Sequence, residues 1–271
     1  MIGMLRSEFY KLFTKKSFYI CAFILMFLVG VNVWTYEWQV NERYAAQYAA
    51  FNLPFEGIDL KKVGYTAWNA LEIWLNLSGA PWIAIFSSIF VCSEFSSGAI
   101  KNLAIRGKNR FAIYFSKLLV CMLVPIIYYL LSGIVCYSIG AYLWSPGSWD
   151  SKYLDSLLIP AGLNILVQIV YQSFFVMIAY LCRSSGWASA LNFGIASDLL
   201  PGFAITGVNY ISKNWFGVNN LPLYKYWIGY YTSVDWPLTE EIKKYFLIVI
   251  LAYLIIPSII GSLVFQRREI K

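Results

Sequence analysis

The sequence predicts an all-α protein that crosses a lipid bilayer six times. Of its 271 residues, 59% are hydrophobic and only 13% are charged, whereas about a quarter of the residues in an ordinary soluble domain are charged. The mean hydropathy over the full length is +0.60. Apolar stretches long enough to cross a hydrocarbon layer of about 30 Å recur along the chain. These observations nearly exclude a soluble fold, and we expect one transmembrane domain over residues 1–271.

Six stretches are each long enough to cross the bilayer as a helix. The first is too long for the apolar core of a signal peptide and lacks a cleavage site, so we interpret it as a retained helix. The fifth is interrupted by Asp198, Pro201 and Gly202. The expected spans are residues 17–36, 73–93, 111–144, 157–182, 187–208 and 243–265.

Basic residues set the expected orientation. An even number of spans places both ends of the chain on one side, and that side holds more than half of the 21 basic residues, with few acids. The positive-inside rule therefore puts both termini in the cytoplasm of a cell-membrane protein. This explains the net charge of +7 better than a nucleic-acid partner does. The basic residues on this side are Arg6, Lys11, Lys15, Lys16, Lys101, Arg106, Lys108, Arg110, Lys117, Arg183, Arg267, Arg268 and Lys271.

Two long loops lie on the opposite side in this topology, at residues 37–72 and 209–242. The second is rich in aromatic residues, which favour the boundary between membrane and water. It either dips into the outer leaflet as short re-entrant helices or forms a simple aromatic belt that anchors the bundle.

Residues 1–16 have the pattern of an amphipathic helix. Apolar residues recur at helical spacing, and Arg6, Lys11 and Lys15 lie off that stripe. Such a helix lies in the membrane interface with its apolar face in lipid and its lysines near anionic headgroups. A basic flank that only sets topology gives the same pattern.

The loop between the second and third spans holds a second short amphipathic helix. Ser96, Ser97 and Gly98 mark a break, residues 99–106 follow with helical spacing, and Gly107 stops the helix. Asn109 is placed to cap the third span. A basic helix held between two membrane helices suits the transmission of force from a soluble partner, and it equally suits a loop that only sets topology.

Polar residues inside the spans are expected to face protein or water, because unpaired amides in hydrocarbon are costly. Asn164, Gln168 and Gln172 recur every four residues on one face of the fourth span. In the fifth, Gly194 belongs to a ridge of small residues that also contains Asp198. These residues either hold helices together or line a translocation path or a dimer seam.

Histidine is absent, which removes Ser-His-Asp and Cys-His nucleophiles and HExxH zinc sites. The five cysteines all lie in apolar runs without a CxxC pair, so we expect small buried residues and neither catalysis nor a metal site.

Two segments together resemble the ABC-2 type permeases, and most of all the small six-helix permeases of antimicrobial-peptide ABC exporters, the bacitracin and lantibiotic self-protection type. The resemblance rests first on Leu5, Glu8, Phe9, Tyr10, Lys11, Leu12, Lys15 and Lys16. It rests also on Glu94, Gly98, Ile100, Lys101, Asn102 and Leu103, followed by Arg110, Ile113, Tyr114, Lys117, Leu118 and Leu119.

The resemblance implies an interfacial helix at residues 2–15, a coupling helix near 96–107, re-entrant segments before the last span and a separate ATP-binding subunit. The coupling residues it implies are Glu94, Gly98, Ile100, Lys101, Leu103, Arg106 and Arg110. Glu94 then pairs with Arg106 or Arg110 or receives a basic residue of the ATPase; otherwise it is a solvated charge at a helix end.

The resemblance predicts a permease subunit that exports an amphipathic or hydrophobic substrate, of which an antimicrobial peptide is one example. The chain has no G-x-x-x-x-G-K-[ST] loop, so we expect ATP and Mg²⁺ to be used by two copies of a partner ATPase. A second permease, identical or related, and membrane lipids complete the expected partners. The alternatives are a membrane-embedded lipid-modifying enzyme and a non-transporting sensor or assembly protein.

Overall fold

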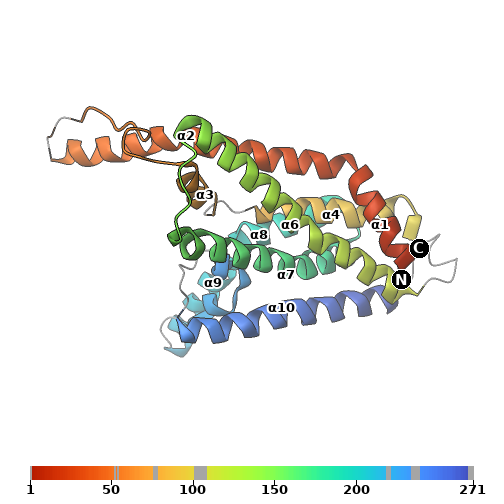
Figure 1. Ribbon diagram of the computed structural model, residues 1–271. Helices are drawn as coiled ribbons and strands as arrows, with labels where there is room; N and C mark the ends of the chain where they lie inside the picture. The colour runs from red at the N-terminus through yellow and green to blue at the C-terminus, as the bar shows by residue number, and fades with distance from the viewer. Residues whose placement is uncertain are drawn as a thin grey trace.

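A computed structural model describes most of the chain as long helices that run side by side in an elongated bundle (Figure 1). Within the described residues every regular element is helical, which confirms the all-α prediction. The described residues are 2–51, 53, 55–75, 79–100, 109–217, 221–232 and 239–267.

The elements follow one another along the chain, and the connection from α2 to α3, residues 51–66, is a long one. They are α1 (Ile2–Thr14), α2 (Lys16–Ala50), α3 (Ala67–Leu75), α4 (Ala80–Ser96), α6 (Arg110–Leu143), the π-helical turn η1 (Leu154–Leu158), α7 (Ile159–Cys182), α8 (Ser185–Ala196), α9 (Leu199–Phe216), the 3-10 turns η2 (Leu223–Tyr226) and η3 (Ile228–Thr232), and α10 (Glu240–Arg267).

Both ends of the chain lie at the same end of the bundle, which we call the termini end (Figure 1). A direct contact fixes this arrangement: Arg110, at the start of α6, donates a hydrogen bond of 2.9 Å to the carbonyl of Gln266 near the end of α10. The other end, where α2 and α9 extend furthest, is called the opposite end.

Four helical segments are long and apolar enough to cross a membrane: α2, α6, α10 and residues Asp155–Cys182. Two further pairs of helices meet the same test together but are bent, α3 with α4 by 62° and α8 with α9 by 61°. The described residues therefore provide four spans, or up to six if each bent pair is one span.

The outer faces of α2 and α10 are apolar. Phe23 on α2 is 66% exposed and Leu247 on α10 is 61% exposed, and each has apolar neighbours on the same face. Faces of this size are not stable in water, so they are the surfaces that contact lipid.

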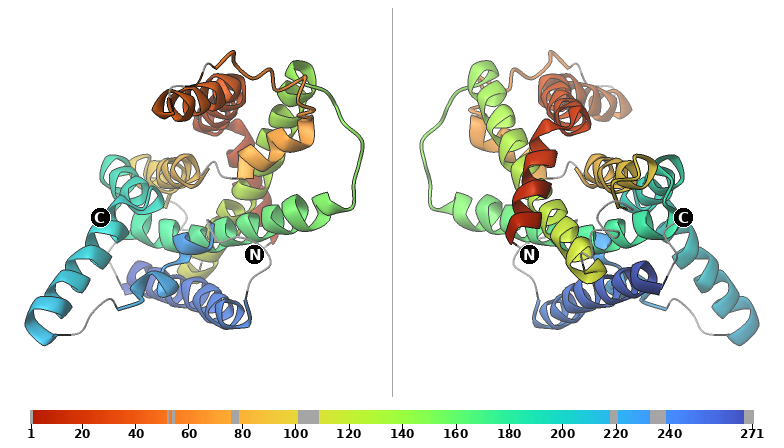
Figure 2. Two further views of the ribbon diagram at one scale, coloured as in Figure 1. Left: turned by 90° about the vertical axis from the view of Figure 1, so that its left-hand side faces the viewer. Right: turned by 90° about the vertical axis from the view of Figure 1, so that its right-hand side faces the viewer.

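Three of the predicted spans differ from the helices observed. The span predicted at 73–93 begins in α3 and continues in α4, and these two helices are bent by 62°. The helix predicted at 17–36 continues to Ala50, because residues 37–50 contain four alanines and neither glycine nor proline. The span predicted at 187–208 is not one straight helix: α8 ends at Ala196, and α9 leaves the bundle sideways (Figure 2).

The buried residues form two clusters that meet at α7. The larger cluster joins α1, α2, α4 and α6 to one face of α7. The smaller one joins α8, η3 and α10 to another face. The aromatic loop contributes to the smaller cluster, because Ile228 is fully buried there and the ring of Tyr231 packs on Phe246. This part of the loop is packed into the bundle and is more than an anchoring belt.

Candidate functional site at the termini end

Four charged side chains form a closed ring of ion pairs at the termini end. Glu8 and Lys11 come from α1, Glu94 from the last turn of α4 and Lys117 from the second turn of α6. Lys11 Nζ lies 2.6 Å from Glu8 and 2.8 Å from Glu94. Lys117 Nζ lies 3.0 Å from Glu8 and 2.5 Å from Glu94. Each lysine therefore bridges both glutamates, and the formal charge of this charge ring is zero.

Three of the four members are shielded from solvent. Lys117 is 0% exposed, Glu94 3% and Glu8 5%, whereas the side chain of Lys11 is 30% exposed. An ion in such a place loses most of its hydration, a cost of several kcal/mol that only close, well-placed partners offset. The charge ring is therefore sensitive to the loss of any one member.

Helical spacing in α1 supplies half of the ring. Glu8 and Lys11 are three residues apart and so share a face. Leu12, fully buried in the main core, fixes that face toward α6 and α4, while Phe9 and Phe13 face outward. The expected position of Lys11 and Lys15 among lipid headgroups is wrong: both side chains turn into the bundle, because buried acids and carbonyls lie there.

The aromatic ring of Phe90 forms cation–π contacts with two lysines. The ammonium groups of Lys117 and Lys15 lie 4.6 Å and 5.1 Å from the centre of the Phe90 ring, a geometry that stabilises cations. Lys15 also donates hydrogen bonds to Ser93 Oγ and, at 3.5 Å, to the carbonyl of Phe90. Lys15 thereby ties the junction between α1 and α2 to α4.

The two lysines outside the spans respond differently to this environment. Burial lowers the pKa of Lys11, but hydrogen bonds to Glu8 and Glu94 raise it by more, so its pKa lies above the ordinary value. Burial lowers the pKa of Lys15, and the positive charge of Lys117 lowers it further. The two acids thus stabilise the charged form of Lys11, whereas the surroundings of Lys15 disfavour its charge.

Aromatic side chains next to the charge ring connect the remaining helices. The ring of Tyr180 on α7 packs on Phe95, Tyr114 and Phe265, which belong to α4, α6 and α10. Tyr114 fits only because residue 261 is glycine, since a Cβ there would lie 2.8 Å from Tyr114 Cζ. A displacement of α4 is therefore passed on to the other helices through rigid contacts.

The predicted coupling residues lie around the loop between α4 and α6. Gly98 has a φ of +69°, which suits glycine and turns the chain after α4. Ile100 is 1% exposed and belongs to the main core. Asn109 accepts a hydrogen bond from the Phe111 amide and caps α6, as predicted. Lys101, Leu103 and Arg106 fall within residues 101–108 and lie outside the described residues.

Glu94 does not behave as a solvated charge at a helix end. Its carboxylate is buried and pairs with Lys11 and Lys117. Arg110, another of the predicted coupling residues, donates to the carbonyls of Phe265 and Gln266 and so joins α6 to α10. Both residues connect the ends of the loop to neighbouring helices.

The polar residues of α7 are all buried. Asn164 donates to the carbonyl of Leu75 at 3.5 Å, and Gln172 accepts a hydrogen bond from Ser87 on α4. Gln168 lies between them on the helix and is 0% exposed. Asn192 on α8, which the sequence did not single out, donates to Ser88 Oγ and to the Phe175 carbonyl. This face of α7 is therefore turned to protein, toward α4 and α8.

Asp198 lies at the break between α8 and α9, about 18 Å along the helix axis from the start of α8. It adopts a φ of +57°, and Oδ1 accepts a 2.6 Å hydrogen bond from the Trp227 indole. A Cβ at Gly229 would lie 2.5 Å from this oxygen and 2.7 Å from the Tyr171 hydroxyl, so the three groups are tightly packed. Gly194 faces Leu200 of α9 and so belongs to the same bend.

Sequence reasoning missed the charge ring and the partner of Asp198. One signal was present: Glu8 and Lys11 share a face of α1, and Glu94 and Lys117, of opposite charge, stand where their spans meet the same loop. Among the described residues, no group of three Cys, Asp or Glu side chains comes together to hold a metal ion.

A family model described as ABC-2 family transporter protein matches residues 4–197, which run from α1 to the end of α8. The chain belongs to the ABC-2 transporter family. The match contains every member of the charge ring and the whole loop between α4 and α6. Membership and the apolar helices together show a multi-pass membrane protein of the transport permease type. The chain matches no curated protein.

Proposed function

We propose that this ABC-2 protein is the transmembrane permease subunit of an ATP-driven exporter that moves an amphipathic or hydrophobic substrate toward the opposite end of the bundle. Each bent helix pair then counts as one span, which gives six spans and cytoplasmic termini. Two cytoplasmic ATP-binding subunits use ATP and Mg²⁺, and a second permease, identical or related, completes the complex. An antimicrobial peptide is one substrate that fits this description.

One observation carries the proposal: both ends of the loop between α4 and α6 are fixed to the charge ring. Glu94 stands three residues before Ser97, and Lys117 stands two helical turns after Asn109. Because both pair with Glu8 or Lys11 on α1, a force on the loop acts on α1, α4 and α6 at once. Arg110 extends the connection to α10.

ATP drives transport only if it favours one arrangement of the helices over another. The charge ring contributes to this because its members pair with one another across three helices, so α1, α4 and α6 move as one unit. The bend at Asp198 follows the end of α8, which packs closely on α4. It is therefore the place where motion of α4 changes the path of the chain toward the opposite end.

Purification of the tagged full-length chain from native membranes tests the proposal. We expect a protein with a G-x-x-x-x-G-K-[ST] loop to co-purify and to hydrolyse ATP. Charge reversal of Lys101 and Arg106 should separate the two proteins and lower that hydrolysis, while reversal of Lys62, at the far side of the membrane in this topology, should leave the complex intact. A chain that purifies without an ATPase, or a complex indifferent to the loop, contradicts the proposal.

The substrate class is tested in intact cells. Deletion of the gene should sensitise cells to amphipathic compounds, with antimicrobial peptides among those screened. Sensitivity limited to hydrophilic compounds contradicts the proposed substrate class.

A further inference from the structure

A cavity of about 910 Å³ runs along α2 toward the opposite end of the bundle, away from the charge ring. Its walls are the outer half of α2, residues 65–73 on and before α3, and Trp82 in the first turn of α4. The volume lies at the upper end of the range for ligand pockets in proteins. Neither the family match nor the proposed function assigns a role to it.

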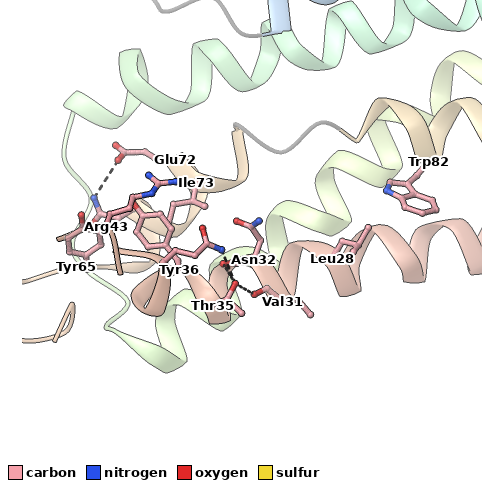
Figure 3. Close-up of a pocket in the computed structure, with 12 residues that line it drawn as sticks. Leu28, Val31, Asn32, Thr35, Tyr36, Arg43, Tyr65, Glu72, Ile73 and Trp82 are labelled. Atoms are coloured by element: carbon pink, nitrogen blue, oxygen red, sulfur yellow. Dashed lines mark hydrogen bonds between the residues drawn. The ribbon is translucent and has the colours of Figure 1, made fainter. Parts of the chain in front are cut away.

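The lining changes from apolar to charged along the length of the cavity (Figure 3). Leu28, Val31 and Trp82 form one end, and Gln39, Arg43 and Glu72 form the other. Leu28 and Arg43 are fifteen residues apart on one helix, so the two ends are separated by about 22 Å. A ligand that fills the cavity must therefore be amphipathic.

The position of the cavity along α2 matches the boundary of a bilayer. A hydrocarbon layer of about 30 Å takes about 20 helical residues, and α2 begins at Lys16. The layer then ends near Tyr36. Leu28 and Val31 lie within the hydrocarbon, whereas Gln39 and Arg43 lie at the level of the lipid headgroups.

The charged end carries both signs. Arg43 is exposed, and its guanidinium suits a phosphate, which it can contact through two parallel hydrogen bonds. Glu72 is half-buried on α3 at the same end and accepts a hydrogen bond of 3.4 Å from Asn69 (Figure 3). A carboxylate accepts several hydrogen bonds, so Glu72 suits an ammonium group as well. A headgroup with a phosphate next to an amine satisfies both, while an anionic headgroup satisfies only Arg43.

We propose that this cavity binds one zwitterionic phospholipid with a primary amine from the leaflet at the opposite end, with its phosphate at Arg43, its ammonium at Glu72 and an acyl chain against Leu28 and Trp82. Leu28 and Val31 line the cavity and are exposed on the surface of α2, so the lipid enters sideways from that leaflet without crossing the bundle. Binding requires no ATPase and no transport, so this site is independent of the exporter proposal.

Native mass spectrometry of the purified full-length chain, without ATP, tests the site. The probes are phosphatidylethanolamine and phosphatidylglycerol with the same acyl chains. We expect one phosphatidylethanolamine per chain, bound about tenfold more tightly than phosphatidylglycerol, since one charge-assisted contact is gained. Equal binding of the two lipids overturns the proposal.

Three variants locate the binding. Glu72→Gln keeps the shape of the side chain and should remove the preference for phosphatidylethanolamine while leaving phosphatidylglycerol unaffected. Arg43→Gln should weaken both lipids about tenfold. Lys62→Gln is the matched control, because Lys62 is an exposed cation near the same end that does not line the cavity. A preference that survives Glu72→Gln, or that is lost in Lys62→Gln, overturns the assignment.

Two compounds that compete with the bound lipid test which chemical class of ligand the cavity accepts. Glycerophosphoethanolamine, the headgroup without acyl chains, should not displace the lipid, because the apolar end of the cavity would stay empty. A cationic amphipathic peptide should displace it only weakly, since Arg43 repels it. Full displacement by either compound overturns the proposal.

Discussion

Replacement of Lys117 by methionine is the sharpest test of the charge ring. Lys117 is 0% exposed, and its ammonium group lies within 3.0 Å of both glutamates. Methionine fills a similar volume but leaves Glu8 and Glu94 with Lys11 alone, so one excess negative charge stays buried. Loss of one member of a buried ion pair costs about 3–5 kcal/mol, and we expect a loss of this size in the free energy of unfolding.

Two further variants, Glu94→Gln and the combination of Lys117→Met with Glu94→Gln, complete a double-mutant cycle. Glu94→Gln alone leaves one excess positive charge and should also cost about 3–5 kcal/mol. The double variant restores neutrality with a Glu8–Lys11 pair, so its cost should fall at least about 2 kcal/mol short of the sum of the single costs. Lys16→Met is the control, because Lys16 is exposed at the same end and should change stability by less than about 0.5 kcal/mol.

Equilibrium unfolding of the purified chain in mixed micelles measures all four variants. If Lys117→Met costs no more than Lys16→Met, or if the two single costs simply add, the ring does not hold α1, α4 and α6 together. The reasoning about force transmission would then be refuted.

Three further predictions concern the bend and the packing of α3 and α7. Asp198→Asn should preserve the fold, because asparagine accepts the Trp227 hydrogen bond and tolerates the φ of +57°; Asp198→Ala should lose about 1–2 kcal/mol of stability in thermal unfolding, and equal losses would mean that the charge itself is required. Gly140→Ala should be less stable than Gly133→Ala by about 1–3 kcal/mol. A Cβ at Gly140 would clash with Ala70 Cβ at 2.5 Å, whereas a Cβ at Gly133 would lie 3.5 Å from Trp74, an ordinary contact distance. Equal melting temperatures of the two variants would contradict the close contact of α6 and α3. Gln172→Leu should cost more than Gln172→Leu combined with Ser87→Ala, because the single variant leaves the Ser87 hydroxyl buried without its acceptor; a double variant that unfolds more readily than the single one would refute this pairing.

The sequence predicted those features that depend on local pattern. The apolar run at 111–144 became α6 almost residue for residue, and Asn109 capped it, because hydropathy and capping are properties of neighbouring residues. The end of α2 was missed for a related reason. Hydropathy reports where lipid ends, and a helix without glycine or proline continues beyond that point.

The charge ring could not be predicted in the same way. Glu8 and Lys117 are far apart in the sequence, and only the packing of α1 against α6 brings them together. The bend in the fifth span was predicted only in part. Pro201 and Gly202 indicated an interruption, but the break falls at Ser197 and Asp198, and Pro201 occupies the first turn of α9, where proline is tolerated.

The orientation of the termini end is the central claim, and labelling of single cysteines in intact cells tests it most directly. One cysteine is added at Ser97, next to the charge ring, or at Gln47, which is exposed on the half of α2 nearer the opposite end. Cys182 is replaced by serine, and the other four native cysteines stay because they are buried. An impermeant thiol reagent should modify the Gln47→Cys variant in intact cells and the Ser97→Cys variant only after the membrane is opened. Modification of Ser97→Cys in intact cells, with Gln47→Cys protected, would place the loop on the wrong side for any cytoplasmic ATPase.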